Sequence, residues 1–148
     1  MGTDGPCLHI LLVDDSEDDV LLARRAFSGL EKPHVLHTAC CAEEALEYLE
    51  RRGRHSGRAG RQPDMLLLDL NMPGMGGLEL LKRLKADPVL RKIPVVILTT
   101  SATQDDVNRC YESGAASYIT KPSTMEEFGL MTRAFAHYWA RVSDLPSE

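Results

Sequence analysis

The sequence has few aromatic residues, no long apolar run and no excess of positive charge. Aromatic side chains make up 5% of the 148 residues. No stretch approaches the roughly 20 apolar residues that a membrane-spanning helix requires. Acidic residues outnumber basic ones by 22 to 17, which argues against sequence-independent binding to nucleic-acid phosphates. We therefore expect no membrane segment and no nucleic-acid partner.

The sequence also lacks the patterns of a secreted protein. Residues 1–7 do not have the basic-then-apolar layout of a secretion signal. The cysteines form no CxxC pair and no zinc-ligand spacing, so we expect reduced thiols at Cys7, Cys40, Cys41 and Cys110. We therefore expect a cytoplasmic protein, and the length suits one domain over residues 1–148.

Short apolar runs alternate with segments of helical periodicity. Nearly continuous apolar runs are typical of strands buried on both faces. They predict five strands, at residues 8–13, 35–41, 65–68, 93–98 and 117–120. Five helices are expected over about 16–29, 42–50, 78–85, 105–112 and 123–142, the first opened by a capping box of Ser16 and Asp19. Strict alternation predicts an α/β, doubly wound parallel sheet with helices on both faces.

Polar side chains stand at the carboxyl ends of four predicted strands, where open α/β sheets bind ligands. They are Asp14, Asp15, Asp69, Thr99 and Lys121. Three neighbouring carboxylates repel one another unless a cation joins them, and a few oxygen ligands suit Mg²⁺ (or Mn²⁺). One acidic strand end alone is usually a cap or turn residue, but five complementary groups predict a site.

Glycine-rich phosphate loops are also missing. No GxGxxG and no GxxxxGK[ST] follows any predicted strand, which excludes the usual dinucleotide and nucleoside-triphosphate cradles. A carboxylate beside Mg²⁺, a lysine and a threonine hydroxyl suits a smaller group, an aspartyl phosphate. Asp69 would attack phosphorus while the cation and the ammonium neutralise the phosphoryl oxygens.

These motifs together resemble the receiver domains of two-component response regulators. The resemblance rests on the acidic pair after the first strand, on Asp69 in LLLDLNMPGMGG, on Thr99, and on Lys121 followed by Pro122; it covers residues 8–139. It implies a flavodoxin-like sheet of order 2-1-3-4-5. It also implies a phospho-acceptor signalling protein rather than an enzyme, with a sensor histidine kinase as phosphoryl donor.

The resemblance assigns a role to each site residue. Asp69 would be the phospho-acceptor, and Mg²⁺ would be held by Asp15, by Asp69 and by the backbone carbonyl of Asn71, with Asp14 acting through water. Thr99 and Lys121 would bind the phosphoryl group, and a cis peptide bond before Pro122 is expected to aim the lysine. Three residues would tune dephosphorylation, namely Asn71, Thr100 and Ser101.

Phosphorylation would draw Thr99 inward and free space for Tyr118, which matches the family's aromatic switch position. Tyr118 has a plainer alternative as a half-buried packing residue. The surface of the fourth helix, fifth strand and fifth helix would then change shape and be read by an unidentified downstream protein. Only residues 143–148 follow the last helix, so no effector domain is expected.

The last helix carries two apolar stripes. Phe128, Phe135, Trp139 and Val142 share one face, expected to pack on the sheet, and a neighbouring stripe contains Met131, Ala134 and Tyr138. A second stripe favours a protein interface, and we expect a homodimer in which Met131, Tyr138 and Trp139 take part. A broad core helix in a monomer is the alternative.

The loop over residues 51–61 carries five arginines and no acid, a composition that usually indicates a solvated segment. Its length and the aromatic last helix resemble the stand-alone regulators paired with bacterial phytochromes. Two other functions stay open at this point. One is a degenerate receiver that binds constitutively, and the other is a Mg²⁺-dependent phosphohydrolase, whose DxD pattern is disrupted here by Asn71.

Overall fold

A computed structural model of the chain describes residues 7–31 and 33–146. Residues 1–6, on which the argument against a secretion signal mostly rests, lie outside the described residues. Strands and helices alternate as predicted: β1 (Leu8–Val13), α1 (Glu17–Ser28), β2 (His34–Ala39), α2 (Ala42–Glu50), β3 (Met65–Leu68), α3 (Gly77–Ala86), β4 (Val95–Thr99), α4 (Gln104–Glu112), β5 (Ser117–Thr120) and α5 (Met125–His137). Short helical turns follow α2, α3 and α5, at Gly53–His55, Leu90–Lys92 and Tyr138–Val142.

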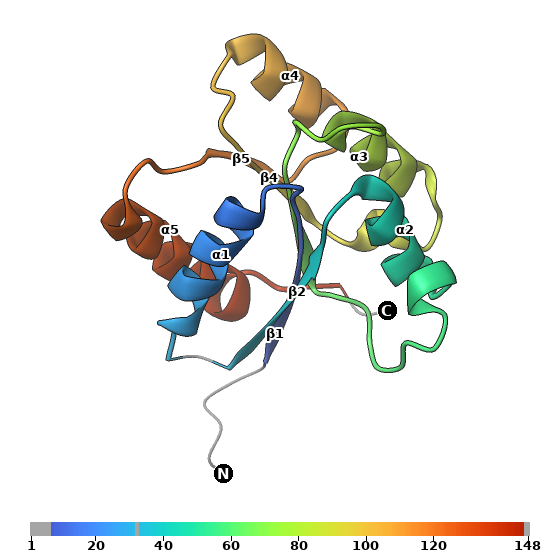
Figure 1. Cartoon of the computed structure of the whole chain (residues 1–148), viewed down its shortest axis with the longest axis horizontal. Coiled ribbons are helices and arrows are strands. Elements are labelled where there is room, and N and C mark those ends of the chain that lie inside the picture. The colour runs from blue at the N-terminus through green and yellow to red at the C-terminus, as the bar shows by residue number, and fades with distance from the viewer. Residues whose placement is uncertain (1–6, 32, 147–148) are drawn as a thin grey trace.

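The five strands form one parallel sheet in the order β2-β1-β3-β4-β5 (Figure 1). Helices α1 and α5 cover one face, and α2, α3 and α4 cover the other. This arrangement confirms the predicted fold class and strand order. It places the carboxyl ends of all five strands along one edge, which is where the polar strand ends gather.

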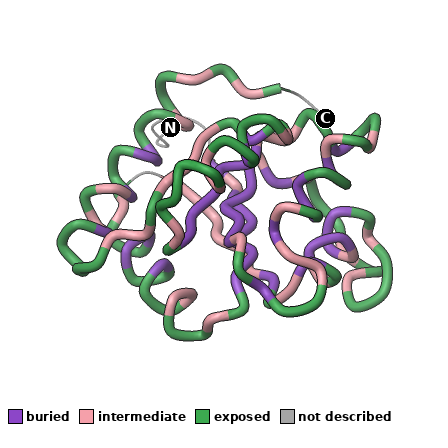
Figure 2. Tube along the Cα trace, turned by 90° about the horizontal axis from the view of Figure 1, so that it is seen from above, coloured by how far each residue is buried: buried purple, intermediate pink, exposed green. Residues whose placement is uncertain are grey.

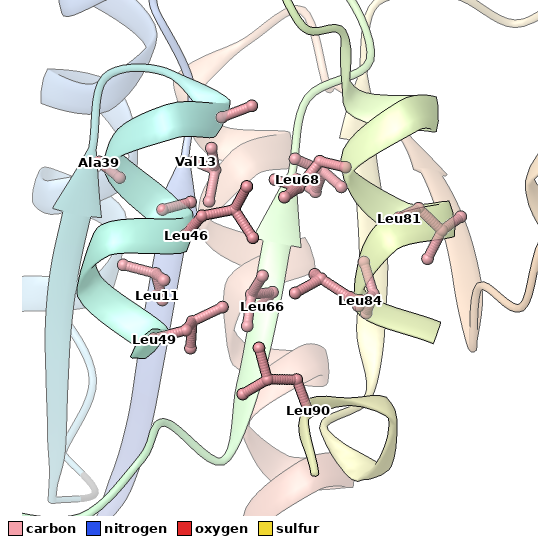
Figure 3. Packing of buried hydrophobic residues seen from close by; sticks show 14 of the residues in the cluster. Leu11, Val13, Ala39, Leu46, Leu49, Leu66, Leu68, Leu81, Leu84 and Leu90 are labelled. Carbon is pink, nitrogen blue, oxygen red and sulfur yellow. The ribbon is translucent and has the colours of Figure 1, made fainter. Parts of the chain in front are cut away.

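Strands β1 and β3, which lie side by side in the sheet, are buried on both faces, as their continuous apolar runs predict. Every residue of β3 is buried, and burial is concentrated along the middle of the sheet (Figure 2). Alternate side chains serve opposite cores: Leu66 and Leu68 pack under α2 and α3 (Figure 3), whereas Leu67 packs under α1 and α5. Each fully buried leucine contributes about 1.5–3 kcal/mol, so the sheet is a stable base for the site.

Several element ends differ from the prediction, by one or two residues except at the end of α5, and two of these differences have a local cause. Strand β2 stops at Ala39 because Cys41 caps α2, its Sγ accepting the backbone N–H of Glu44 at 3.4 Å. The α-helical part of α5 ends at His137, and a π-helical turn, Tyr138–Val142, follows it directly. The wider turn changes the angular position of the residues that follow. Val142 was predicted on the sheet-facing stripe but is 59% exposed.

The arginine-rich loop is mostly exposed, as its composition indicates, but two of its arginines also anchor it to the domain. The guanidinium of Arg58 lies 3.9 Å from the ring centroid of Tyr48 and donates to its backbone carbonyl at 2.8 Å. Arg61 donates to both carboxylate oxygens of Asp64, at 2.6 and 3.0 Å. A planar guanidinium can stack and donate at once, so these arginines fasten the loop below α2.

All four cysteine thiols are unpaired. Within residues 7–31 and 33–146, no helix combines the length and apolar content needed to cross a bilayer.

Candidate functional site

The register of the parallel sheet brings the polar strand ends together. Val13 of β1 pairs with Leu68 of β3. The residues that follow them, Asp14 and Asp69, therefore lie side by side at the ends of the two strands. The backbone N–H of Asp69 donates to the carbonyl of Val13 at 3.0 Å. Residues far apart in the sequence thus meet because two strands end at the same level.

Three carboxylates form an acidic cluster at this edge. Oxygen atoms of Asp14, Asp15 and Asp69 lie within 4.8 Å of one another. Asp14 and Asp69 are buried, at 3% and 6% exposure, whereas Asp15 is exposed. Carboxylates this close repel one another. Three carboxylate ligands, of which one is exposed to solvent, suit a divalent cation that keeps part of its water shell. The donor set therefore fits Mg²⁺ or Mn²⁺.

Lys121 supplies the positive charge of the site. Its Nζ lies 2.8 Å from Asp14 Oδ2 and 3.5 Å from Asp69 Oδ2, and its side chain is only 7% exposed. Burial lowers the pKa of this ammonium, but the hydrogen bonds to Asp14 and Asp19 and the charges of Asp14 and Asp69 outweigh burial and raise the pKa to about 12. Lys121 therefore stays charged at any physiological pH.

Asp14 uses both carboxylate oxygens within the protein. Oδ1 accepts the backbone N–H of Ser16 at 2.9 Å, and Oδ2 accepts Lys121 Nζ. Burial nevertheless raises the pKa of Asp14, because removal from water penalises its charge more than the Lys121 and Ser16 hydrogen bonds favour it. A divalent cation beside Asp14 would offset this penalty by favouring the charged form of the carboxylate.

One member of the site, Asp19, was not predicted from the sequence. It was interpreted as half of a capping box, and its backbone N–H does donate to Ser16 Oγ at 3.2 Å. Its carboxylate, however, accepts Lys121 Nζ at 2.7 Å, which is the shortest contact of that ammonium among the described residues. Asp19 and Lys121 are 102 positions apart, so no local pattern signals this pair.

The peptide bond between Lys121 and Pro122 is trans, which contradicts the expected cis bond. The backbone N–H of Lys121 donates to the carbonyl of Thr99 at 2.8 Å, extending the ladder between β4 and β5. The long lysine side chain reaches Asp14 from this extended backbone, so no cis bond is needed to aim it, and trans remains the lower-energy isomer.

The remaining predicted site residues lie on β4, on β5 and on the loops that follow β3 and β4. Thr99 is fully buried, and Asn71 Nδ2 lies 3.5 Å from its Oγ1. Thr100 is exposed and Ser101 is half-buried on the loop after β4. The hydroxyl of Tyr118, itself half-buried, donates to the backbone carbonyl of Ser101 at 2.8 Å. Tyr118 therefore ties β5 to the same loop that carries Thr100 and Ser101.

The predicted interface residues lie in α5 and in the π-helical turn that follows it. Met131 and Trp139 are partly buried and pack against the core under α1 and α5. Tyr138 is 49% exposed, and its ring stands perpendicular to that of Trp139 with the centroids 5.0 Å apart. Tyr138 thus presents an aromatic ring to the surface, supported from below by Trp139.

Comparison with known proteins points to one family. Residues 10–133 match the model of the response regulator receiver domain. Response regulator Rcp1 of Synechocystis sp. is 33% identical over 138 residues, covering 93% of this chain and 92% of that protein. The structure of the phosphorylated cyanobacterial phytochrome response regulator RcpA superposes with a TM-score of 0.87 at 34% identity, covering 96% of this chain and 100% of RcpA. The Mn²⁺-bound form of Rcp1 gives 0.85 at 33% identity, covering 95% and 99%.

The acidic cluster of Asp14, Asp15 and Asp69 is of the kind that forms the metal site of receivers, and the Rcp1 structure contains Mn²⁺. Receiver domains are phospho-acceptor signalling domains of two-component systems rather than enzymes in the usual sense, and each implies a cognate histidine kinase. Fold, acidic cluster and sequence similarity therefore agree, and this chain belongs to the response regulator receiver domain family, with similarity to phytochrome response regulators.

Proposed function

We propose that Asp69 accepts the phosphoryl group in this receiver. What supports this assignment is the position of its carboxylate, which is buried beside two further carboxylates and 3.5 Å from the ammonium of Lys121. In the transfer, an oxygen of Asp69 forms a bond to phosphorus while the bond between phosphorus and the histidine nitrogen of the kinase breaks. The electron pair of that bond stays on the imidazole.

We propose that the divalent cation is held by Asp15, by Asp69 and by the backbone carbonyl of Asn71, with Asp14 acting through water. Bound there, Mg²⁺ or Mn²⁺ neutralises charge on the phosphoryl oxygens. Lys121 and the Thr99 hydroxyl are proposed to bind those oxygens directly. Nearby polar groups then tune the access of water to the phosphate, and we assign this role to Asn71, Thr100 and Ser101.

We propose that Tyr118 couples the site to the surface formed by α4, β5 and α5. Phosphorylation adds about 1.5–2 negative charges, and Thr99 is drawn toward them. The Tyr118 hydroxyl bonds the carbonyl of Ser101 on the loop that follows Thr99, so movement of that loop changes the partner of Tyr118. A downstream protein that prefers the altered surface reads the signal, and the receiver domain itself carries the output.

The cognate kinase is proposed to be a bacterial phytochrome. Similarity to Rcp1 and RcpA over almost their full lengths supports this choice. A phosphotransfer comparison tests it: radiolabelled phosphoryl groups are expected to move to the receiver faster from a phytochrome kinase than from sensor kinases of other classes. Equal or slower transfer from the phytochrome would contradict the assignment.

We also propose a homodimer through α5 and the turn that follows it. Apolar side chains are exposed there, namely Leu130 at 56%, Tyr138 at 49% and Val142 at 59%. A patch of this kind favours a protein partner, and a second copy would cover it symmetrically.

We place the protein in the cytoplasm, where thiols are kept reduced, because its four cysteines are unpaired.

Incubation with acetyl phosphate and Mg²⁺ tests the central proposal. We expect one acid-stable, base-labile phosphoryl group per chain on Asp69, and none on an Asp69→Asn protein. Asp87→Asn, which removes a carboxylate from the end of α3, serves as the matched control and should be labelled like wild type.

Two results would contradict the proposal. Repeated turnover of a phosphomonoester would indicate a phosphohydrolase, and an Asp69→Asn protein that binds its partner as the phosphorylated wild type does would indicate a constitutive binding module.

A further inference from the structure

Four residues at the start of α1 and the end of β5 are joined in a closed ring of hydrogen bonds. Asp14 Oδ1 accepts the backbone N–H of Ser16 at 2.9 Å, and Ser16 Oγ accepts the backbone N–H of Asp19 at 3.2 Å. Lys121 closes the ring by donating to Asp19 Oδ2 at 2.7 Å and to Asp14 Oδ2 at 2.8 Å. The ammonium is therefore anchored on the first turn of α1.

The ring explains why the carboxylate of Asp19 faces the site. In a complete capping box this side chain would turn back to the backbone N–H of the N-cap residue. Here that N–H, on Ser16, is already bonded to Asp14, which leaves the Asp19 carboxylate available for Lys121. Asp19 is 33% exposed, whereas the lysine side chain is 7% exposed, so the pair lies at the rim of the site.

The ammonium is held closer to α1 than to the phospho-acceptor. Lys121 Nζ is 3.5 Å from Asp69 Oδ2, which is longer than its contacts with Asp14 and Asp19. An ammonium has three N–H donors, and two of them serve these short bonds. The third N–H donates to Asp69 Oδ2 across the longer distance of 3.5 Å, so a shorter bond to a group on Asp69 requires the ammonium to move away from the carboxylates that hold it.

We propose that Asp19 is a positioning residue that competes with the phosphoryl group on Asp69 for the ammonium of Lys121. The inference rests on the proposed role of Asp69 as phospho-acceptor. In the unphosphorylated protein Asp19 holds the ammonium on α1, and in the phosphorylated protein the ammonium leaves Asp19 for the phosphoryl oxygens. An equilibrium shifts only by the difference in interaction between two states, so Asp19 lowers the affinity of the site for a phosphoryl group.

Beryllofluoride, a stable mimic of the phosphoryl group on aspartate, provides the test. Its affinity in the presence of Mg²⁺ is measured for wild type, Asp19→Asn and Asp18→Asn. Asp18 is exposed on the same helical turn, so the Asp18→Asn control removes the same charge without removing a partner of Lys121. We expect about two- to fivefold tighter binding for Asp19→Asn, the effect of losing one partly exposed ion pair, and a change of less than about twofold for Asp18→Asn.

Two further variants separate competition from a general disturbance. Asp19→Ala should also tighten binding, because it removes the acceptor altogether, and Asp19→Glu should return the affinity toward wild type by restoring a carboxylate. A merely structural defect would weaken binding, so a gain of affinity distinguishes the two.

The inference is overturned when wild type binds beryllofluoride and Asp19→Asn binds it equally, more weakly, or with the same gain as Asp18→Asn. Failure of wild type to bind beryllofluoride at all would instead overturn the proposed function of Asp69, and the role of Asp19 with it.

Discussion

Gly77, the first residue of α3, lies directly against the backbone of Asp69. A Cβ atom added to Gly77 would overlap the carbonyl oxygen of Asp69 and stand 2.8 Å from the Cα of Leu70. Both neighbours are backbone atoms that follow β3, and the Gly77 N–H also donates to the Leu70 carbonyl at 3.1 Å. The residue proposed to accept the phosphoryl group is thus supported from behind by a helix that can approach because it begins with glycine.

We expect Gly77→Ala to lower the free energy of unfolding by about 1–3 kcal/mol, the usual cost of overpacking, and to weaken beryllofluoride binding. Urea unfolding measures the first effect. Gly57→Ala is the matched control, since no described atom lies within 4 Å of a Cβ at that position, and we expect a change below about 0.5 kcal/mol. Equal stabilities for the two variants would contradict the close contact.

Divalent cations should stabilise the protein by relieving repulsion among Asp14, Asp15 and Asp69. At about 100 times the dissociation constant, Mg²⁺ is expected to add about 2.7 kcal/mol to the free energy of unfolding. The rise in melting temperature should vanish on chelation with EDTA and be largely lost in Asp15→Asn. Asp18→Asn should keep it. A wild-type melting temperature that does not respond to Mg²⁺ would contradict a cation site.

The raised pKa of Lys121 predicts a loss of stability at high pH. A base whose pKa is about 12 in the folded protein, against its ordinary value of 10.5, contributes stability below pH 10.5 and loses it as the pH rises through 12. Wild type should therefore be more stable than Lys121→Met by about 1–2 kcal/mol at pH 8–10, and the difference should shrink above pH 11. Urea unfolding of both proteins measures it. The exposed Lys82 gives the control, and a Lys121→Met difference no larger than that of Lys82→Met would exclude this electrostatic role.

The guanidinium of Arg58 is expected to stabilise the loop below α2. Arg58→Lys retains the charge but loses the planar fork over Tyr48, so we expect a loss of about 1–2 kcal/mol in urea unfolding. Arg52→Lys, at a residue whose side chain is 56% exposed, should cost less than about 0.5 kcal/mol. A loop that is merely solvated would give the same small change for both variants.

Tyr138→Glu should convert the proposed dimer to a monomer, because it places a charge in the exposed apolar patch after α5. Sedimentation velocity distinguishes the two masses. Val89→Glu introduces the same charge at a residue that is 69% exposed outside this patch, and that variant should remain dimeric. A wild-type protein that sediments as a monomer at high concentration would refute the interface.

Local patterns predicted most of the fold. The continuous apolar runs of β1 and β3 indicated strands buried on both faces, and both strands are buried so. Element ends were less predictable, because the cap at Cys41 and the π-helical turn after His137 depend on side-chain geometry rather than on periodicity. The anchoring of the arginine loop could not be predicted from its composition, since the partners Tyr48 and Asp64 lie outside it.

Residue patterns along the chain were enough to predict the alternation of strands and helices, and with it the edge at which Asp14, Asp69, Thr99 and Lys121 would meet. That inference holds because parallel strands joined by right-handed crossovers must end on the same side. Which carboxylates hold the ammonium of Lys121 depends instead on contacts between distant residues in the folded chain. Asp19 takes part because the N–H of Ser16 already donates to Asp14. Hydrophobic periodicity carries no information about which of several acceptors a donor will choose.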